Sequence, residues 1–116
     1  MLFFGSLRQH SKRGYNFNRF SGQTYLKDYH LDGFEMYEVA GGAYPAVCEG
    51  SGEIKVELHS VEDNAANYIE KMELGAGYTP KKISVYYNDE KVDATMYVWP
   101  KERLTGKPLV KSGDWE

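Results

Sequence analysis

Strand-type patterns fill most of the chain from residue 23 to residue 99, and one helical pattern interrupts them. Residues 54–59 alternate apolar and polar side chains, as a half-buried strand does. Apolar residues recur at helical spacing between 61 and 72. This order predicts an α+β domain with one main helix and about six or seven strands, which a small mixed β-barrel would leave without open edges.

The first half of the chain is expected to hold several short strands. Leu2–Gly5 is apolar on both faces, which predicts a central first strand. Gln9–Gly22 is polar and basic and is interpreted as a long loop. Asp32-Gly33 indicates a hairpin turn inside the strand pattern of Gln23–Val39. Gly41–Ala46 is interpreted as the next turn.

The helix has a start signal, an apolar stripe and a stop signal. Ser60 is the expected N-cap, with acidic residues in the turn that follows. Gly75 or Gly77 is expected to end the helix. The residues that form the stripe facing the core are Val61, Ala65, Tyr68, Ile69 and Met72.

Two glutamates on this helix differ in position. At ~100° per residue, Glu70 lies opposite the apolar stripe and faces solvent, whereas Glu73 lies on its border. A carboxylate at the edge of an apolar face is partly desolvated, so its pKa rises toward the range of a general acid/base. The alternative is an ordinary solvated glutamate at a helix end.

The last part of the chain predicts a hairpin and a tail. Residues 80–87 and 92–99 are predicted to form two paired strands joined by a turn at Asn88-Asp89. The tail 100–116 is expected to be mostly irregular. No linker or repeat divides the 116 residues, so the prediction is a single domain over 1–116.

Composition excludes several classes of protein. A net charge of -3 argues against a dedicated nucleic-acid binder. Cys48 is the only cysteine, which excludes an internal disulfide and a cysteine-clustered zinc site and favours a reduced, cytoplasmic setting. No apolar stretch is long enough for a signal-peptide core or a membrane span, so we expect a soluble protein without a membrane partner.

Other reactive residues give no site signal. The three histidines (His10, His30 and His59) lack metal-ligand spacing and are expected at the surface, and Cys48 is expected in the core. No dinucleotide or Walker-type glycine pattern occurs. A basic segment with interleaved aromatic residues could bind phosphate or nucleic acid, although a solvated loop is the commoner reading; its cations are Arg8, Lys12, Arg13 and Arg19.

The turn after the first strand has binding potential. Gly5-Ser6 ends an apolar run, and glycine at a strand end leaves backbone N–H groups free to hold a carboxylate or an oxyanion. Many strands end in this way, so this signal gains weight only from the motifs that accompany it.

An ordered series of motifs along the whole chain resembles the γ-glutamylcyclotransferase-like family. The first is Phe3–Arg8, which is similar to the family's Tyr-Gly-Ser-Leu-Arg signature, with Phe4 in place of the tyrosine. The others, each similar to a family motif in the same order, are Gly14–Asn16, Tyr44–Ala46, Val56–Leu58, Ile69–Glu73 with Tyr78, Ala94–Val98 and Ser112–Trp115.

The resemblance implies a fold and a reaction. The family's fold is a small mixed β-barrel, and its active members release amines or amino acids from γ-glutamyl compounds as 5-oxoproline, as a lyase or acyltransferase without metal or cofactor. It implies that Glu73 is the acid/base. The residues that it implies for substrate binding are Phe4, Gly5, Ser6, Leu7, Arg8, Tyr44 and Tyr97.

A second reading is a non-catalytic protein whose pocket binds or sequesters a small anionic metabolite or nucleotide. The basic loop, the Gly5-Ser6 turn and Phe4 motivate it. Neither reading specifies the substrate or the oligomeric state.

Overall fold

The computed structural model describes residues 1–4, 23–42 and 44–114. In these residues an α-helix lies between strands, and two 3-10 turns follow strands. The elements in chain order are β1 (Leu2–Phe3), β2 (Gln23–Val39), η2 (Ala40–Gly42), β3 (Tyr44–Val61), α1 (Asp63–Gly75), β4 (Thr79–Tyr87), β5 (Glu90–Val98) and η3 (Lys101–Leu104).

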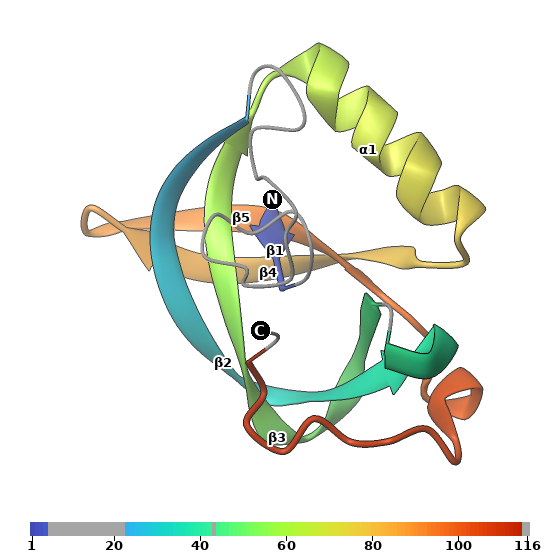
Figure 1. The fold of residues 1–116 in the computed structure, drawn as a ribbon. Helices are drawn as coiled ribbons and strands as arrows, with labels where there is room; N and C mark the ends of the chain where they lie inside the picture. Colours follow the sequence, from blue (N-terminus) through green and yellow to red (C-terminus); the bar gives the residue numbers. More distant parts are fainter. Residues whose placement is uncertain (5–22, 43, 115–116) are drawn as a thin grey trace.

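The strands form two antiparallel sheets, one ordered β1-β3-β2 and one formed by β4 and β5. Figure 1 shows the long, curved β2–β3 hairpin, the β4–β5 hairpin crossing it, and α1 to one side. The α+β class and the single main helix are therefore confirmed. Within the described residues the five strands do not close into one hydrogen-bonded barrel, and they are fewer than expected.

The predicted position of the first strand is wrong. β1 pairs only with β3 in the described sheet, through Leu2↔Leu58 and Phe3↔Glu57, so β3 is the central strand. Both residues of β1 are nevertheless buried. The apolar sequence indicated that both faces of this strand are buried. An edge strand is also buried on both faces when other elements cover it.

The expected hairpin at Asp32-Gly33 is also wrong, because β2 runs through it. The register with β3 shifts between Asp32 and Phe34, and Gly33 has φ +90°. Between these pairs β2 has Gly33 alone whereas β3 has the three residues 50–52, so this irregularity bends the ladder without reversing β2. The chain reverses at Ala40–Gly42 instead, and Tyr44, expected in a turn, already pairs with Val39.

Helix α1 starts later than its sequence signal suggested. Ser60 pairs with Thr24 in the sheet, and Glu62 is the N-cap residue. Gly75 ends the helix, as expected. Ala65 and Ile69 of the predicted stripe are buried, whereas Tyr68 is 60% exposed, so the buried face is narrower than the pattern implied.

The second hairpin is confirmed. Asn88 (φ 50°) and Asp89 (φ 64°) form the turn between β4 and β5, where both central residues need positive φ. After β5, the Trp99 N–H donates to the Val47 carbonyl at 2.9 Å, which ties this hairpin to β3. This bond places Trp99 beside the strand that follows η2.

The core contains a histidine that was expected at the surface, together with a glutamate. Glu57 and His59 are 0% and 1% exposed, and Nε2 of His59 lies 3.0 Å from Oε1 of Glu57. Their burial shows that the second face of β3 is covered, and the His59 ring packs edge-on against Phe3 and Tyr25 of the neighbouring strands. The prediction for Cys48 is confirmed, because its side chain is fully buried.

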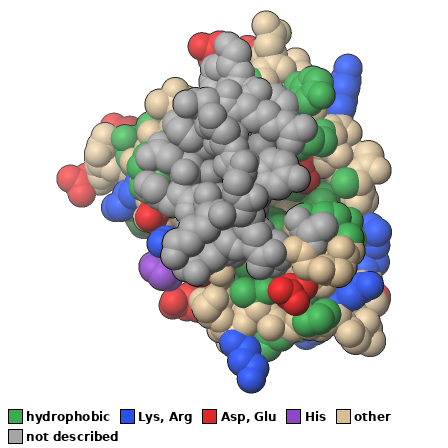
Figure 2. All heavy atoms as spheres, viewed as in Figure 1, with side chains coloured by type: hydrophobic (Ala, Val, Ile, Leu, Met, Phe, Trp, Pro, Cys, Tyr) green, Lys and Arg blue, Asp and Glu red, His purple; other side chains and the backbone are tan. Residues whose placement is uncertain are grey.

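The outer surface carries mixed charge. Figure 2 shows acidic and basic side chains interspersed with hydrophobic ones around the part of this face that is described. Among the described helices, none is both long enough and apolar enough to cross a bilayer.

The irregular tail after η3 is held to the sheet by backbone hydrogen bonds. Val110 N–H donates to the Met36 carbonyl at 2.8 Å, and Lys55 N–H donates to the Gly113 carbonyl at 2.7 Å. Gly113 has φ +70°, and a Cβ there would collide with the Glu53 backbone carbonyl. Glycine is therefore required at this position both for its conformation and for space.

We expect Gly113→Ala to lower the free energy of unfolding by about 1–3 kcal/mol, through strain at positive φ and through this collision. Gly106→Ala is the matched control, because Gly106 has φ +80° and no atom within 4 Å of its added Cβ. Urea unfolding of both variants separates the two contributions. Equal losses would mean that the contact with Glu53 does not constrain the tail.

Candidate functional site

The end of α1 places Glu73 and Tyr78 side by side. Tyr78 N–H donates to the Glu73 carbonyl at 3.0 Å, and Gly77 N–H donates to the Leu74 carbonyl at 3.1 Å. With Gly77 at φ +91°, these two bonds form a Schellman motif. In this motif the third residue from the helix end contacts the second residue beyond the cap, here Glu73 and Tyr78.

The Glu73 side chain is partly buried, and burial raises its pKa from 4.5 to about 7. Burial also raises the pKa of Tyr97, and the charges of Glu70 and Glu73 add to this effect. The charges of both glutamates therefore act on β5, and Glu73 is the more buried of the two. Near neutral pH it can both accept and return a proton, which an ordinary solvated glutamate does poorly.

Tyr78 is fixed in the core beside this carboxyl group. Its hydroxyl donates to the Pro45 carbonyl at 2.8 Å, and its ring centroid lies 5.3 Å from that of Trp99. Burial raises the pKa of Tyr78; Glu73 and then Tyr44 raise it further, while Arg103 lowers it. Tyr78 thus remains a neutral phenol between a carboxyl group and a guanidinium group.

Arg103 belongs to η3 and lies beside Trp99 and Gly77. Its guanidinium carbon lies 3.9 Å from the Trp99 ring centroid, and Nη1 donates to the Gly77 carbonyl at 3.2 Å. Trp99 is itself buried, and its Nε1 has no hydrogen-bond partner among the residues that the structure describes. We call Glu73, Tyr78, Trp99 and Arg103 the helix-end cluster.

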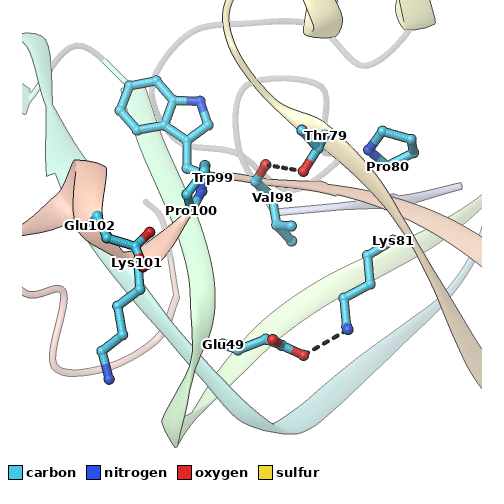
Figure 3. A pocket seen from close by; sticks show the side chains of 9 residues that line it. All are labelled: Glu49, Thr79, Pro80, Lys81, Val98, Trp99, Pro100, Lys101 and Glu102. Carbon is cyan, nitrogen blue, oxygen red and sulfur yellow. Dashed lines mark hydrogen bonds and ion pairs between the residues drawn. The ribbon is translucent and has the colours of Figure 1, made fainter.

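A pocket of about 450 Å³ adjoins Trp99. Figure 3 shows an ion pair of 2.6 Å between Lys81 and Glu49 on one side, and the Trp99 ring pointing away from that pair. Glu73 does not line this pocket. Trp99 is the residue shared by the pocket and the helix-end cluster.

The residues predicted for the site are only partly brought together. Tyr97 is buried, and its pKa is raised by burial and then by the charges of Glu70 and Glu73. Tyr44 is 37% exposed, and the centroid of its ring lies 6.5 Å from that of Trp99. Phe4 is buried in the main core. The remaining predicted residues, Gly5, Ser6, Leu7 and Arg8, lie outside the described residues, as do His10 and the rest of the basic segment.

Three members of the helix-end cluster were not predicted as site residues. The spacing of Gly75, Gly77 and Tyr78 is a Schellman signal that could have placed Tyr78 beside Glu73. Trp99 and Arg103 gave no such signal, because a tertiary contact brings them there. In the part of the chain that the structure describes, no three His, Cys, Asp or Glu side chains gather as a metal site.

Comparison with known proteins identifies a family. The family model described as "Gamma-glutamyl cyclotransferase, AIG2-like" matches residues 1–116. No curated protein sequence matches the chain.

Three solved structures share the fold. Protein ytfP from Escherichia coli is 24% identical, with a TM-score of 0.73 over 99% of this chain and 94% of that one. The uncharacterized protein PH0828 from Pyrococcus horikoshii is 24% identical, with a TM-score of 0.68 over 99% and 87%. The uropathogenic E. coli-specific protein c4763 is 16% identical, with a TM-score of 0.71 over 98% and 89%.

Proposed function

The chain belongs to the AIG2-like γ-glutamyl cyclotransferase family, and we propose that it releases an amine or amino acid from a γ-glutamyl compound as 5-oxoproline. The observation that carries this proposal is the burial of Glu73, which raises the pKa of that carboxyl group to about 7. A carboxylate with this pKa can take up a proton and return it within one reaction cycle.

The reaction needs one nucleophile, one acid/base and a stabilised oxyanion. The substrate's own α-amine attacks the γ-carbonyl carbon, so a C–N bond forms within one molecule. Glu73 accepts the proton of the attacking amine and then donates it to the leaving nitrogen as the original amide bond breaks. Electrons and protons balance without an external reagent. Backbone N–H groups of Gly5, Ser6 and Leu7 are the proposed contacts for the substrate carboxylate and the oxyanion.

Phe4, Arg8, Tyr44 and Tyr97 complete the proposed substrate contacts. The buried Tyr97 supports this assignment best, because burial and then the charges of Glu70 and Glu73 raise the pKa of its hydroxyl. Phe4 is apolar and buried, and it directly precedes Gly5 in the sequence. A phenylalanine here has no hydroxyl to donate, so the proposed mechanism assigns it no proton.

A direct test is chromatographic detection of 5-oxoproline over a panel of γ-glutamyl amines and γ-glutamyl amino acids. The assay should be run at pH 8, where a carboxyl group with a pKa of about 7 is ionised. We expect release from at least one member of the panel. If no member is cleaved but native mass spectrometry finds an anion bound, the chain is the non-catalytic binding protein of the second reading.

A further inference from the structure

Arg103 has binding capacity that its contacts do not use. Its guanidinium group has five N–H donors, and the one hydrogen bond it makes to another described residue goes to the Gly77 carbonyl. None of the ion pairs between described side chains involves Arg103. Its guanidinium carbon lies over the Trp99 ring, 3.9 Å from the centroid, and this contact limits the side-chain freedom that would be lost when an anion binds.

A second donor lies on Trp99. Its Nε1 N–H is buried and has no hydrogen-bond partner among the described residues. A buried donor in this state is costly unless a ligand or water satisfies it. Two neighbouring residues therefore offer donors without an acceptor in the part of the chain that the structure describes, exposed ones on Arg103 and a buried one on Trp99.

Glu73 and Arg103 meet at the same end of α1, and no ion pair between described side chains joins them. The Tyr78 N–H donates to the Glu73 carbonyl, and Arg103 Nη1 donates to the carbonyl of the adjacent Gly77. Glu73 and Arg103 both act on the pKa of Tyr78, in opposite directions. The Glu73 carboxyl group and the Arg103 guanidinium group therefore both lie near Tyr78. One ligand bound there can contact both groups.

We propose that Arg103 binds a carboxylate carried by the leaving amine, so that the protein prefers γ-glutamyl amino acids to γ-glutamyl derivatives of simple amines. This inference rests on the proposed function. In the proposed reaction Glu73 contacts the leaving nitrogen, and the α-carboxylate of a leaving amino acid is one carbon away from that nitrogen. A guanidinium group next to Tyr78 is suited to bind that carboxylate through two parallel hydrogen bonds.

The test compares γ-glutamyl-alanine with γ-glutamyl-ethylamine, which differ only in the carboxylate of the leaving group. We expect Arg103→Gln to lower kcat/KM for γ-glutamyl-alanine by about 10- to 100-fold, mainly through KM. For γ-glutamyl-ethylamine the change should stay within about twofold, and Arg103→Lys should fall between. Lys107→Gln removes a positive charge from the same exposed tail and should leave the ratio of the two substrates unchanged.

Equal losses for both substrates with Arg103→Gln would overturn the inference, because they would mean that Arg103 only supports Trp99 and Gly77. Calorimetric binding of the two compounds to the native chain and to Arg103→Gln separates the inference from the proposed function. If turnover is absent but Arg103 still favours the carboxylate compound, the proposed function fails and the recognition stands. If neither turnover nor affinity depends on Arg103, the recognition fails.

Discussion

Glu73→Gln is expected to reduce 5-oxoproline release roughly 100- to 10,000-fold, with a smaller change in KM. Glutamine keeps the size of the side chain but cannot accept the proton of the attacking amine. The measurement is the initial rate of 5-oxoproline formation at pH 8 on the best substrate of the panel.

Glu70→Gln is the matched control, since Glu70 belongs to the same helix and is exposed. It should retain activity within about twofold. A Glu73→Gln variant that keeps its activity would rule out the proposed mechanism.

Loss of activity in Glu73→Gln should not reflect unfolding. The folded protein holds a proton on Glu73 up to about pH 7, whereas an ordinary glutamate loses it near 4.5. The native chain therefore loses stability as the pH rises between these values, because the carboxylate must ionise where it is partly buried. At pH 8 Glu73→Gln should be at least as stable as the native chain in urea.

His59→Ala is expected to cost about 3–5 kcal/mol of unfolding free energy. The substitution removes a hydrogen bond of 3.0 Å from the fully buried Glu57 carboxyl group. It also removes a ring that packs edge-on against Phe3 and Tyr25. Urea unfolding monitored by tryptophan fluorescence and by circular dichroism provides the measurement.

The chain supplies an exposed pair of the same chemistry as a control. His30 Nδ1 lies 3.2 Å from Glu53 Oε1, with side chains 64% and 58% exposed. His30→Ala should therefore cost less than about 1 kcal/mol. If the two histidine variants lose equal stability, burial does not strengthen the Glu57–His59 interaction.

Local patterns predicted part of the fold well. The β4–β5 turn was predictable because Asn88-Asp89 is flanked by strands and both residues tolerate positive φ. The same logic failed at Asp32-Gly33, since a glycine that bends a strand and one that reverses it have similar sequence neighbours. Pairing with β2 kept Ser60 in the sheet, so its capping signal was overridden.

The candidate site was predictable only where the helix itself carries the information. Helical geometry alone placed Glu73 on the border of the apolar face, and its side chain is indeed partly buried. Trp99 and Arg103 reach Tyr78 through tertiary contacts that no local pattern encodes. His59 was misassigned for a related reason, because alternation along one strand does not reveal what covers its second face.

The most direct test of this account is the titration of the Glu73 carboxyl group in the folded protein. Carbon-13 labelling of glutamate side chains, with Glu73→Gln to assign the signal, gives this pKa by NMR. We predict a midpoint of about pH 7, because burial at the end of α1 disfavours the carboxylate. A midpoint near 4.5 would show a solvated glutamate and would contradict the proposed role of Glu73 as the acid/base.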